Sequence, residues 1–139
     1  MISLDLDEAA SAACVANASR AAAAATTATA AVEARVGDAR ATGLAPVSVD
    51  VVLCDLPFGR RHVRLDVGAV LRELWRVVRV GGRAVLVFAD VKKFRRAAGR
   101  NGAWDVEGVV PFASGGIPVA AFVLRRLCKR RKTDRKIVM

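Results

Sequence analysis

The sequence predicts an α/β fold in which mostly parallel strands alternate with helices and a hairpin closes the chain. Residues 49–54 (VDVVLC) are almost wholly apolar, as expected for a parallel strand that is covered on both faces. Apolar residues recur at helical spacing over 67–78, and a second apolar strand is expected over 84–88. Two further β runs, near 106–112 and 119–124, flank a Ser-Gly-Gly turn. They predict an antiparallel hairpin with one reversed strand, which completes the α/β pattern.

The N-terminal part of the chain predicts a strand, a helix and a second strand. Residues 2–6 alternate between apolar and polar, and Asp7 then occupies the position of a helix N-cap. We expect this helix to end near Asn17. A low-complexity Ala/Thr tract at 21–31 is interpreted as an insertion, and the alternation over 32–36 indicates a half-buried strand.

Helix boundaries in the rest of the chain follow from capping residues. Asp66 precedes the first apolar residue of the helical pattern and is expected to cap it. The pair Gly81-Gly82 is expected to terminate the same helix. A short basic helix is predicted around 94–100.

Length and composition restrict the class of protein. With 139 residues and 54% hydrophobic residues, the chain is long enough and apolar enough to fold as one domain. The sequence has no run of 18 apolar residues and no basic start typical of a secretory signal. Three widely spaced cysteines without a C-x-x-C pair, and a single histidine, predict no metal site. We therefore expect a reduced, intracellular protein without a membrane partner.

Positive charge is concentrated near the C-terminus. The whole chain has a formal net charge of +10, and residues 125–136 alone contribute eight cations against one aspartate, a net of +7. Such a tail can neutralise phosphates, act as a nuclear address, or be a solvated terminal run. We expect a cytoplasmic protein, with the nucleus as a further compartment.

Aspartates stand at the ends of three predicted strands, namely Asp5, Asp38 and Asp55. In an open α/β sheet, ligands bind beyond the carboxyl ends of the strands. A carboxylate there can accept two ribose hydroxyls or an adenine amino group. The three positions fit a nucleoside cofactor, although a single aspartate at a strand end more often caps the next helix.

The tetrapeptide Asp55-Leu56-Pro57-Phe58 offers the most specific chemistry in the sequence. Pro57 stiffens the turn, so the Asp55 carboxylate and the Leu56 carbonyl are held as two neighbouring acceptors. Phe58 adds an aromatic face, and together these groups suit a planar base with an exocyclic amino group. The alternative is a tight turn after a strand with Phe58 in the core.

The run VDVVLCDLPFGRR, residues 49–61, resembles motif IV of THUMP-domain-containing tRNA guanosine-N2 methyltransferases. The flanking segments resemble the same family in the same order: the Asp5 strand and its helix, residues 36–39, residues 71–86, and the closing hairpin after Gly115-Gly116. The resemblance covers residues 2–127. It implies a Rossmann-like class I methyltransferase sheet, mostly parallel with a C-terminal antiparallel hairpin.

The resemblance also implies a cofactor and its binding residues. The family uses S-adenosyl-L-methionine (AdoMet). Asp5 would bind its ribose, and Asp38 with the Ala39 N–H would hold its adenine. A tRNA is the implied substrate, and a small zinc-binding activator subunit is an implied partner.

The catalytic residues implied by the resemblance lie in the motif itself. Asp55 and the Leu56 carbonyl would orient the guanine N2 amino group, with Pro57 shaping the turn and Phe58 stacking on the base. Catalysis would then consist mainly of alignment and of stabilising positive charge on the nitrogen. Arg60 and Arg61 would contact RNA phosphate, or else be exposed to solvent.

The sequence departs from the family at its start. The family's first strand and glycine-rich loop are missing, and so is the THUMP domain. We therefore expect residues 1–127 to be a partial methyltransferase domain, with the insertion at 21–31, and residues 128–139 to be a basic tail.

Two other functions stay open on the sequence alone. One is a related amino methyltransferase that acts on DNA, a protein glutamine or a small molecule. The other is a catalytically inactive, truncated module that binds RNA or a partner.

Overall fold

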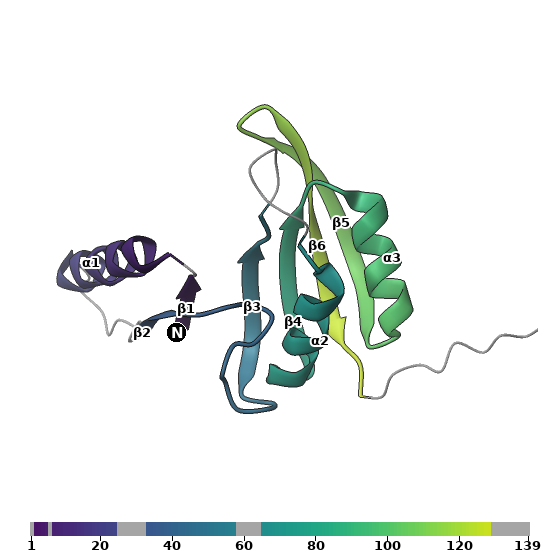
Figure 1. Ribbon diagram of the computed structural model, residues 1–139, viewed down its shortest axis with the longest axis horizontal. Helices are drawn as coiled ribbons and strands as arrows, with labels where there is room; N and C mark the ends of the chain where they lie inside the picture. The colour runs from purple at the N-terminus through teal and green to yellow at the C-terminus, as the bar shows by residue number, and fades with distance from the viewer. Residues whose placement is uncertain (1, 6, 25–32, 58–64, 129–139) are drawn as a thin grey trace, which may run out of the picture. The chain divides into compact units, whose positions relative to one another are not determined.

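The computed structural model describes residues 2–5, 7–24, 33–57 and 65–128. The elements in those residues are β1 (Ile2–Asp5), α1 (Glu8–Ala24), β2 (Glu33–Val36), β3 (Val49–Asp55), α2 (Val67–Val77), β4 (Val78–Phe88), α3 (Val91–Asn101), β5 (Trp104–Ser114) and β6 (Ile117–Arg126). The chain divides into two compact units, unit 1 (residues 1–43) and unit 2 (residues 44–139), and each has its own sheet (Figure 1). The single sheet expected from the sequence is therefore split, because β1 and β2 hydrogen-bond only to each other among the described strands.

Unit 1 is a parallel pair of strands, β1 and β2, connected by α1. Asp7 caps α1 as predicted, since its carboxylate accepts a hydrogen bond from the Ala9 N–H at 2.8 Å. Ser11 is buried, and its hydroxyl donates to the Arg35 carbonyl at 3.2 Å. This bond fastens the helix to β2.

Helix α1 is longer than the sequence predicted. It continues to Ala24, past the expected end near Asn17, and so includes the first residues of the Ala/Thr tract. Alanine has the highest helix propensity of all residues, which accounts for the extension. Residues 25–31 of the tract lie outside the described residues.

Unit 2 contains a four-stranded sheet in the order β3-β4-β6-β5. Strands β3 and β4 are parallel, and β6 is antiparallel to both of its neighbours, so it is the single reversed strand that was predicted. Gly115 and Gly116 form the turn between β5 and β6 with φ angles of 54° and 78°. Positive φ at both positions matches a type I′ turn, which has the twist that a tight hairpin needs.

Helices α2 and α3 lie on the same face of the unit 2 sheet (Figure 1). Each connects parallel strands while the chain moves in the same direction across the sheet, and such connections are right-handed. The apolar stripe of α2 predicted from the sequence is buried: Val67, Val70, Leu71, Leu74 and Val77. In the same layer, Phe94 of α3 stacks on Phe122 of β6 with ring centroids 3.9 Å apart.

Strand β3 is less covered than its apolar sequence predicted. The side chains of Val51 and Leu53 are 58% and 79% exposed. In unit 2, β3 is an end strand with β4 as its neighbour, and both helices cover the other side of the sheet. The expectation of cover on both faces was wrong for these residues, because an apolar run does not distinguish an end strand from a central one.

The prediction that Gly81-Gly82 ends α2 was also wrong. The helix ends at Val77, and the chain enters β4 directly at Val78. Gly82 instead lies where the register between β3 and β4 shifts. A Cβ atom at Gly82 would be 2.7 Å from the Asp50 carbonyl oxygen and 2.9 Å from that of Arg79. Glycine is needed here for a close approach of two backbones rather than for a helix end.

We expect Gly82→Ala to lower the free energy of unfolding by about 1–3 kcal/mol, because the new methyl group has to displace backbone atoms. Gly99→Ala is the matched control, since a Cβ there would meet no atom within 4 Å and the residue is exposed on α3. That variant should gain about 0.5–1 kcal/mol from helix propensity. Urea denaturation of both variants checks the prediction, and a loss of similar size in both would contradict it.

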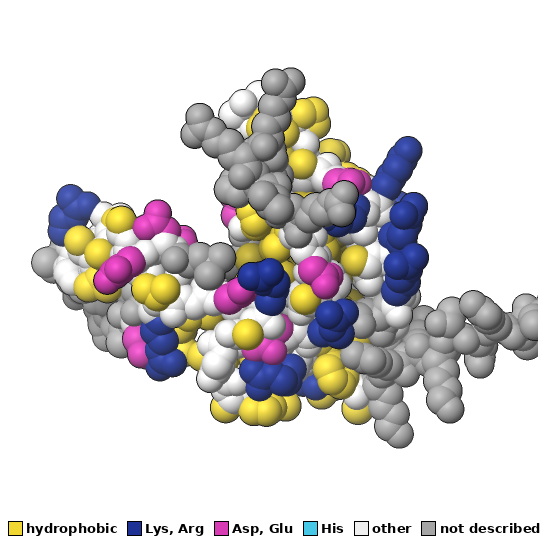
Figure 2. Space-filling view, in the orientation of Figure 1, with side chains coloured by type: hydrophobic (Ala, Val, Ile, Leu, Met, Phe, Trp, Pro, Cys, Tyr) yellow, Lys and Arg dark blue, Asp and Glu magenta, His cyan; other side chains and the backbone are white. Residues whose placement is uncertain are grey.

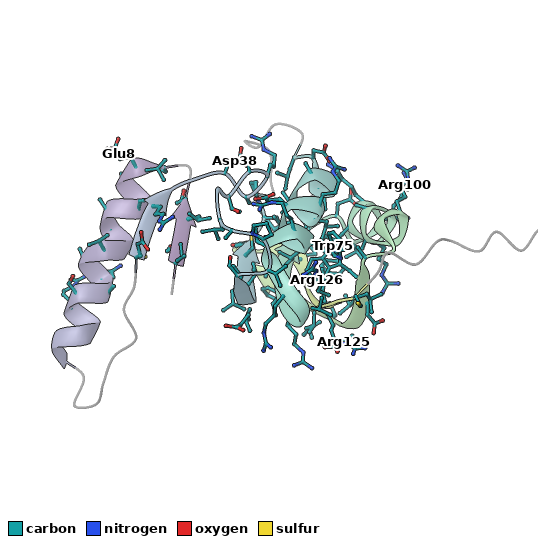
Figure 3. The ribbon with its side chains drawn as sticks, turned by 90° about the horizontal axis from the view of Figure 1, so that it is seen from below. Glu8, Asp38, Trp75, Arg100, Arg125 and Arg126 are labelled. Atoms are coloured by element: carbon teal, nitrogen blue, oxygen red, sulfur yellow. The ribbon has the colours of Figure 1, made fainter. Side chains whose placement is uncertain are left out.

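The end of β6 is fastened to the helix layer by a buried arginine. Arg126 is 7% exposed, and its guanidinium lies 4.5 Å from the centroid of the Trp75 ring (Figure 3). The same group donates a hydrogen bond to the Val78 carbonyl at 2.5 Å. The contact joins β6 to the junction of α2 and β4, and the cation–π geometry partly compensates for burying the charge.

Helix α3 has a strongly basic surface. It contains five cationic residues and no acidic one: Lys92, Lys93, Arg95, Arg96 and Arg100. Figure 2 shows Lys and Arg side chains gathered along this side of the molecule. The basic helix predicted around residues 94–100 is present, and it begins at Val91.

Candidate functional site

The turn that follows β3 holds three of the four residues predicted to be catalytic. The Leu56 N–H donates to the Val87 carbonyl at 3.0 Å, which continues the parallel pairing with β4 by one residue. The Leu56 side chain is 1% exposed and anchors the turn, whereas Asp55 and Pro57 are exposed. Asp55 therefore presents its carboxylate at the carboxyl edge of the unit 2 sheet, where ligands of α/β proteins bind.

The Asp55 carboxylate is available as an acceptor. None of the ion pairs within the described residues includes it. Asp50 on the same strand differs, because it pairs with Arg79 at 2.5 Å. An unpaired carboxylate at a strand end can accept hydrogen bonds from an amino group of a ligand.

Cys54, next to Asp55, is half-buried in β3. Burial raises the pKa of its thiol above the ordinary value of 9.0, and the negative charge of Asp55 raises it further. Both effects disfavour the thiolate, so Cys54 does not have the properties of a nucleophile. This agrees with its interpretation as an inert thiol.

We expect Cys54 to react with iodoacetamide with a pH midpoint above that of the unfolded chain. The folded state keeps its proton at a pH where the unfolded state loses it, so the linked stability is present below about pH 9 and is lost as the pH rises above it. The measurement uses Cys14→Ser/Cys128→Ser, in which Cys54 is the only thiol. Equal midpoints with and without urea would contradict the raised pKa.

Unit 1 brings the predicted cofactor residues to one edge of its own sheet. Asp5 ends β1, and its carbonyl accepts from the Gly37 N–H at 2.8 Å just after β2 ends. Asp38 and Ala39 follow directly in the chain. One oxygen of the exposed Asp5 carboxylate accepts from the Asp7 N–H at 2.9 Å. The second oxygen, Oδ2, has no hydrogen bond of that kind and can accept from a hydroxyl group.

Asp38 is held by an arginine that the sequence analysis did not single out. The Arg40 guanidinium donates to both carboxylate oxygens of Asp38, at 2.6 to 3.0 Å, and the Arg40 N–H donates to one of them at 2.8 Å. These bonds hold the pKa of the Asp38 carboxyl below its usual range. The D-A-R spacing was the available signal, because an aspartate readily binds the backbone two residues later.

Three predicted site residues cannot be placed. Phe58, Arg60 and Arg61 lie outside the described residues, as do the other residues of 58–64. Their predicted roles in stacking and in phosphate binding stay predictions.

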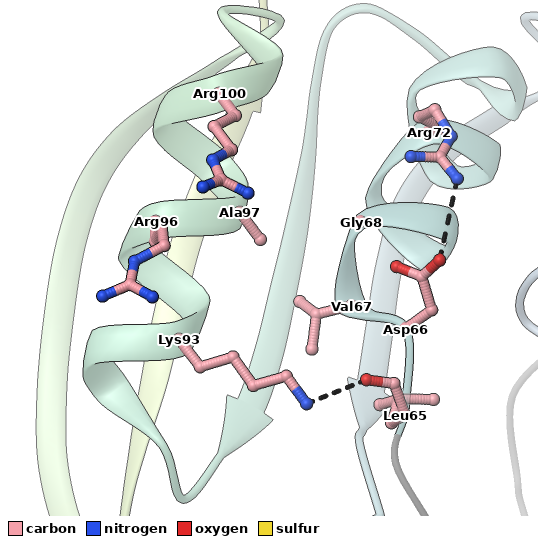
Figure 4. A pocket seen from close by; sticks show the side chains of 9 residues that line it. All are labelled: Leu65, Asp66, Val67, Gly68, Arg72, Lys93, Arg96, Ala97 and Arg100. Atoms are coloured by element: carbon pink, nitrogen blue, oxygen red, sulfur yellow. Dashed lines mark hydrogen bonds and ion pairs between the residues drawn. The ribbon is translucent and has the colours of Figure 1, made fainter.

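A pocket of about 380 Å³ lies between α2 and α3 in unit 2 (Figure 4). The residues before and in the first turns of α2 form one wall, and α3 forms the other. Its charged lining residues are Asp66, Arg72, Lys93, Arg96 and Arg100. The sequence analysis noted the basic helix but did not bring it together with Arg72, because that requires the packing of two helices.

Two further searches of the described residues gave negative results. No group of three His, Cys, Asp or Glu side chains is arranged to hold a metal ion within the described ranges. Among α1, α2 and α3, as far as they are described, none has the length and hydropathy needed to cross a membrane.

Comparison with known protein families decides the classification. A family model described as the RMKL-like methyltransferase domain matches residues 1–118, which is most of the chain. The chain belongs to this family. The methyltransferase resemblance predicted from the strand-end aspartates and the D-L-P-F-G turn is thereby confirmed.

Curated relatives of this methyltransferase chain carry a more specific name. It is 39% identical over 90 residues to the tRNA (guanine(6)-N(2))-methyltransferase THUMP3 of Mus musculus, and 38% identical over 86 residues to that of Bos taurus. The alignments cover 60% and 57% of this chain but only 18% and 17% of the relatives. The chain thus spans under a fifth of the length of the relatives it matches.

Solved structures confirm the class I methyltransferase fold. TrmN from Thermus thermophilus matches with a TM-score of 0.70 and 22% identity, over 91% of this chain and 36% of that protein. A geranyl diphosphate methyltransferase in complex with SAM matches with a TM-score of 0.67 and 14% identity, over 91% of this chain and 68% of that one. At these identities the similarity is one of fold.

Proposed function

We propose that this chain is part of an AdoMet-dependent enzyme that methylates the exocyclic N2 amino group of a guanosine in tRNA. The observation that supports it most is the turn at Asp55-Leu56-Pro57, which presents an unpaired carboxylate at the end of β3 in a methyltransferase-family chain. The names of the curated relatives support the substrate. AdoMet, when bound, supplies an electrophilic methyl group.

The residues of unit 2 would act on the amino group. The Asp55 carboxylate accepts one N–H of the guanine amino group, and the Leu56 carbonyl accepts the other. Pro57 limits the motion of both acceptors, so the nitrogen is held in one orientation. As the nitrogen gains a methyl group it becomes positive until it loses a proton, and the carboxylate stabilises that charge.

The residues of unit 1 fit the cofactor in part. The exposed Asp5 carboxylate has an oxygen that can accept from a ribose hydroxyl, as the proposed role requires. The Asp38 carboxylate is already bound by Arg40, so accepting an adenine amino group requires sharing with or displacing that guanidinium. The Ala39 N–H is the remaining proposed contact to adenine. Stacking by Phe58 and phosphate contacts by Arg60 and Arg61 complete the proposal.

The test is a methyl-transfer assay with the 139-residue chain. The chain is incubated with AdoMet that carries a tritiated methyl group and with unmodified tRNA transcripts, and the RNA is digested to nucleosides. We expect the label in N2-methylguanosine. A second arm uses the mouse relative with its 90-residue matching segment replaced by that of this chain.

Each of the other functions has its own outcome in this assay. Label transferred to DNA or to a protein glutamine in place of tRNA would overturn the substrate. Label in another tRNA nucleoside would overturn the position. If neither the chain nor the chimera transfers methyl groups, the inactive RNA- or partner-binding module is correct.

A small zinc-binding activator subunit is a further proposed partner, which only the family resemblance supports. Affinity purification of the tagged chain should recover a small protein together with about one equivalent of zinc. Recovery of the chain without zinc would contradict it.

We also propose that the protein acts in the cytoplasm and reaches the nucleus through its basic tail at 128–139. The charge of that segment supports the second part. A fluorescent fusion of the chain, compared with one that ends at residue 127, tests the proposal.

A further inference from the structure

The pocket between α2 and α3 lies at the same edge of unit 2 as the Asp55 turn. Helix α2 begins after β3 ends, and α3 begins after β4 ends, so both helices start at the carboxyl edge of these parallel strands. Leu65 and Asp66 precede α2 on one wall of the pocket, and Lys93 lies in the first turn of α3 on the other. A ligand in the pocket would therefore lie on the same unit and at the same sheet edge as the proposed catalytic turn.

The charge of this pocket is strongly unbalanced. Four cations line it, and Asp66 is the only carboxylate among its described lining residues. Asp66 is largely occupied, since its carboxylate accepts the Ala69 N–H at 3.0 Å as the N-cap of α2. Its distance to the Arg72 guanidinium is 3.9 Å, at the limit of an ion pair.

The cations of α3 lack compensating carboxylates. Lys93 Nζ donates to the Leu65 carbonyl at 3.0 Å and lies 5.9 Å from the centroid of the Phe88 ring, so it meets a dipole and a π-face but no acid (Figure 4). Arg96 and Arg100 form no ion pair with any described residue. A solvated helix usually balances its cations with carboxylates three or four residues away, and α3 has none.

The spacing of these cations aligns them along one helix face. Lys93, Arg96 and Arg100 are three and four residues apart, so they form a row about 10 Å long on the side of α3 that faces the pocket. Lys92 and Arg95 lie on the other exposed side of the helix and do not line the pocket. A row of this length is longer than one phosphate group. It fits a chain of phosphates better than a free anion.

We propose that the pocket formed by Arg72, Lys93, Arg96 and Arg100 binds the phosphodiester backbone of the RNA substrate. Arginine donates in a planar fork that matches two phosphate oxygens, and such contacts position a nucleic acid without reading its sequence. The inference rests on the proposed function for the identity of the nucleic acid. It adds a binding surface in unit 2 apart from the basic tail and apart from Arg60 and Arg61.

The test compares two double variants of the full chain with equal loss of charge. Arg96→Gln/Arg100→Gln removes two cations of the pocket, and Lys92→Gln/Arg95→Gln removes two from the other side of the same helix. Glutamine has a helix propensity close to that of lysine and arginine, so both variants should keep α3 intact, and circular dichroism checks this. Affinity for a tRNA transcript is measured by fluorescence anisotropy, without AdoMet, from about 50 to about 200 mM salt.

We expect the pocket variant to bind tRNA about tenfold or more weakly and the slope of log affinity against log salt to fall by about 1.5, since each lost phosphate contact removes about 0.7 to 0.9. The control variant should change the slope by less than half as much. Arg96→Lys/Arg100→Lys keeps the charge and should restore most of the slope. Equal effects of the two glutamine variants, or no effect of either, would overturn the proposal.

Two further arms separate the possible partners and the two proposals. Competition with polyglutamate distinguishes an acidic protein from RNA, and stronger displacement by polyglutamate than by unlabelled tRNA would overturn RNA as the ligand. If the pocket variant loses tRNA affinity while the wild-type chain transfers no methyl group, the pocket proposal stands and the proposed function fails. If the wild-type chain methylates tRNA and the pocket variant binds tRNA unchanged, the reverse holds.

Discussion

Replacing Asp55 with asparagine is expected to lower the rate of methyl transfer to tRNA by about 10²–10³ while leaving AdoMet affinity within a few-fold of the wild type. The carboxylate ends β3 and has no partner among the described cations, so its charge is available to the amino group of the substrate. Asparagine keeps the shape of the side chain but removes the charge. The loss should therefore fall on the transition state, in which the nitrogen becomes positive.

The measurement is a single-turnover rate of methyl transfer, with AdoMet affinity followed by equilibrium dialysis. It uses whichever protein shows activity, the chain itself or the chimera. Asp50→Asn is the matched control, because Asp50 lies on the same strand and pairs with Arg79 at the surface. That variant should retain activity within about twofold, as exposed ion pairs contribute little. A simultaneous loss of AdoMet affinity and transfer in Asp55→Asn would contradict the assigned role.

Replacing Phe122 with alanine is expected to lower the free energy of unfolding of unit 2 by about 3–5 kcal/mol. Phe122 and Phe94 are both fully buried, and their rings stack with centroids 3.9 Å apart and planes 17° apart. The pair joins β6 to α3 at the centre of the helix-covered face. Alanine would lose the burial of a large ring and leave a cavity against Phe94 that the neighbouring side chains fill only in part.

Urea denaturation followed by tryptophan fluorescence measures the effect. Phe112→Ala is the matched control, since Phe112 is on the neighbouring strand of the same hairpin but 44% exposed. It should cost under about 1 kcal/mol. Phe122→Leu, which keeps most of the volume, should cost about 1.5 kcal/mol or less and covers the case in which the alanine variant does not fold. Similar losses for Phe112→Ala and Phe122→Ala would refute a central role for the aromatic pair.

Local sequence signals predicted the elements of the fold well where one physical cause dominates. The helical spacing of Val67, Val70, Leu71 and Leu74 placed the buried face of α2 correctly, and Asp66 does cap that helix. The two glycines after Ser114 do form the hairpin turn, because few other residues adopt positive φ twice in succession. The order of the strands with one reversed strand also followed from the pattern.

The errors arose where a residue responds to a partner that is distant in sequence. Gly82 suggested a helix end, but it is required by the backbone of Asp50 on another strand. The apolar run of β3 suggested cover on both faces, and yet Leu53 is 79% exposed. Asp38 was interpreted without Arg40, whose guanidinium occupies the carboxylate. In each case the sequence shows the residue type, and the structure shows which neighbour it serves.

The sequence by itself determined the family, the fold class and the acceptors proposed for catalysis, because these depend on residue types at fixed local spacings. Only the tertiary structure showed that Leu56 is buried while Asp55 is free, and that Arg72 of α2 faces the basic row of α3. Both facts depend on which helix lies beside which strand. The handedness of two crossover connections decides that, and it brings together side chains that no local pattern connects.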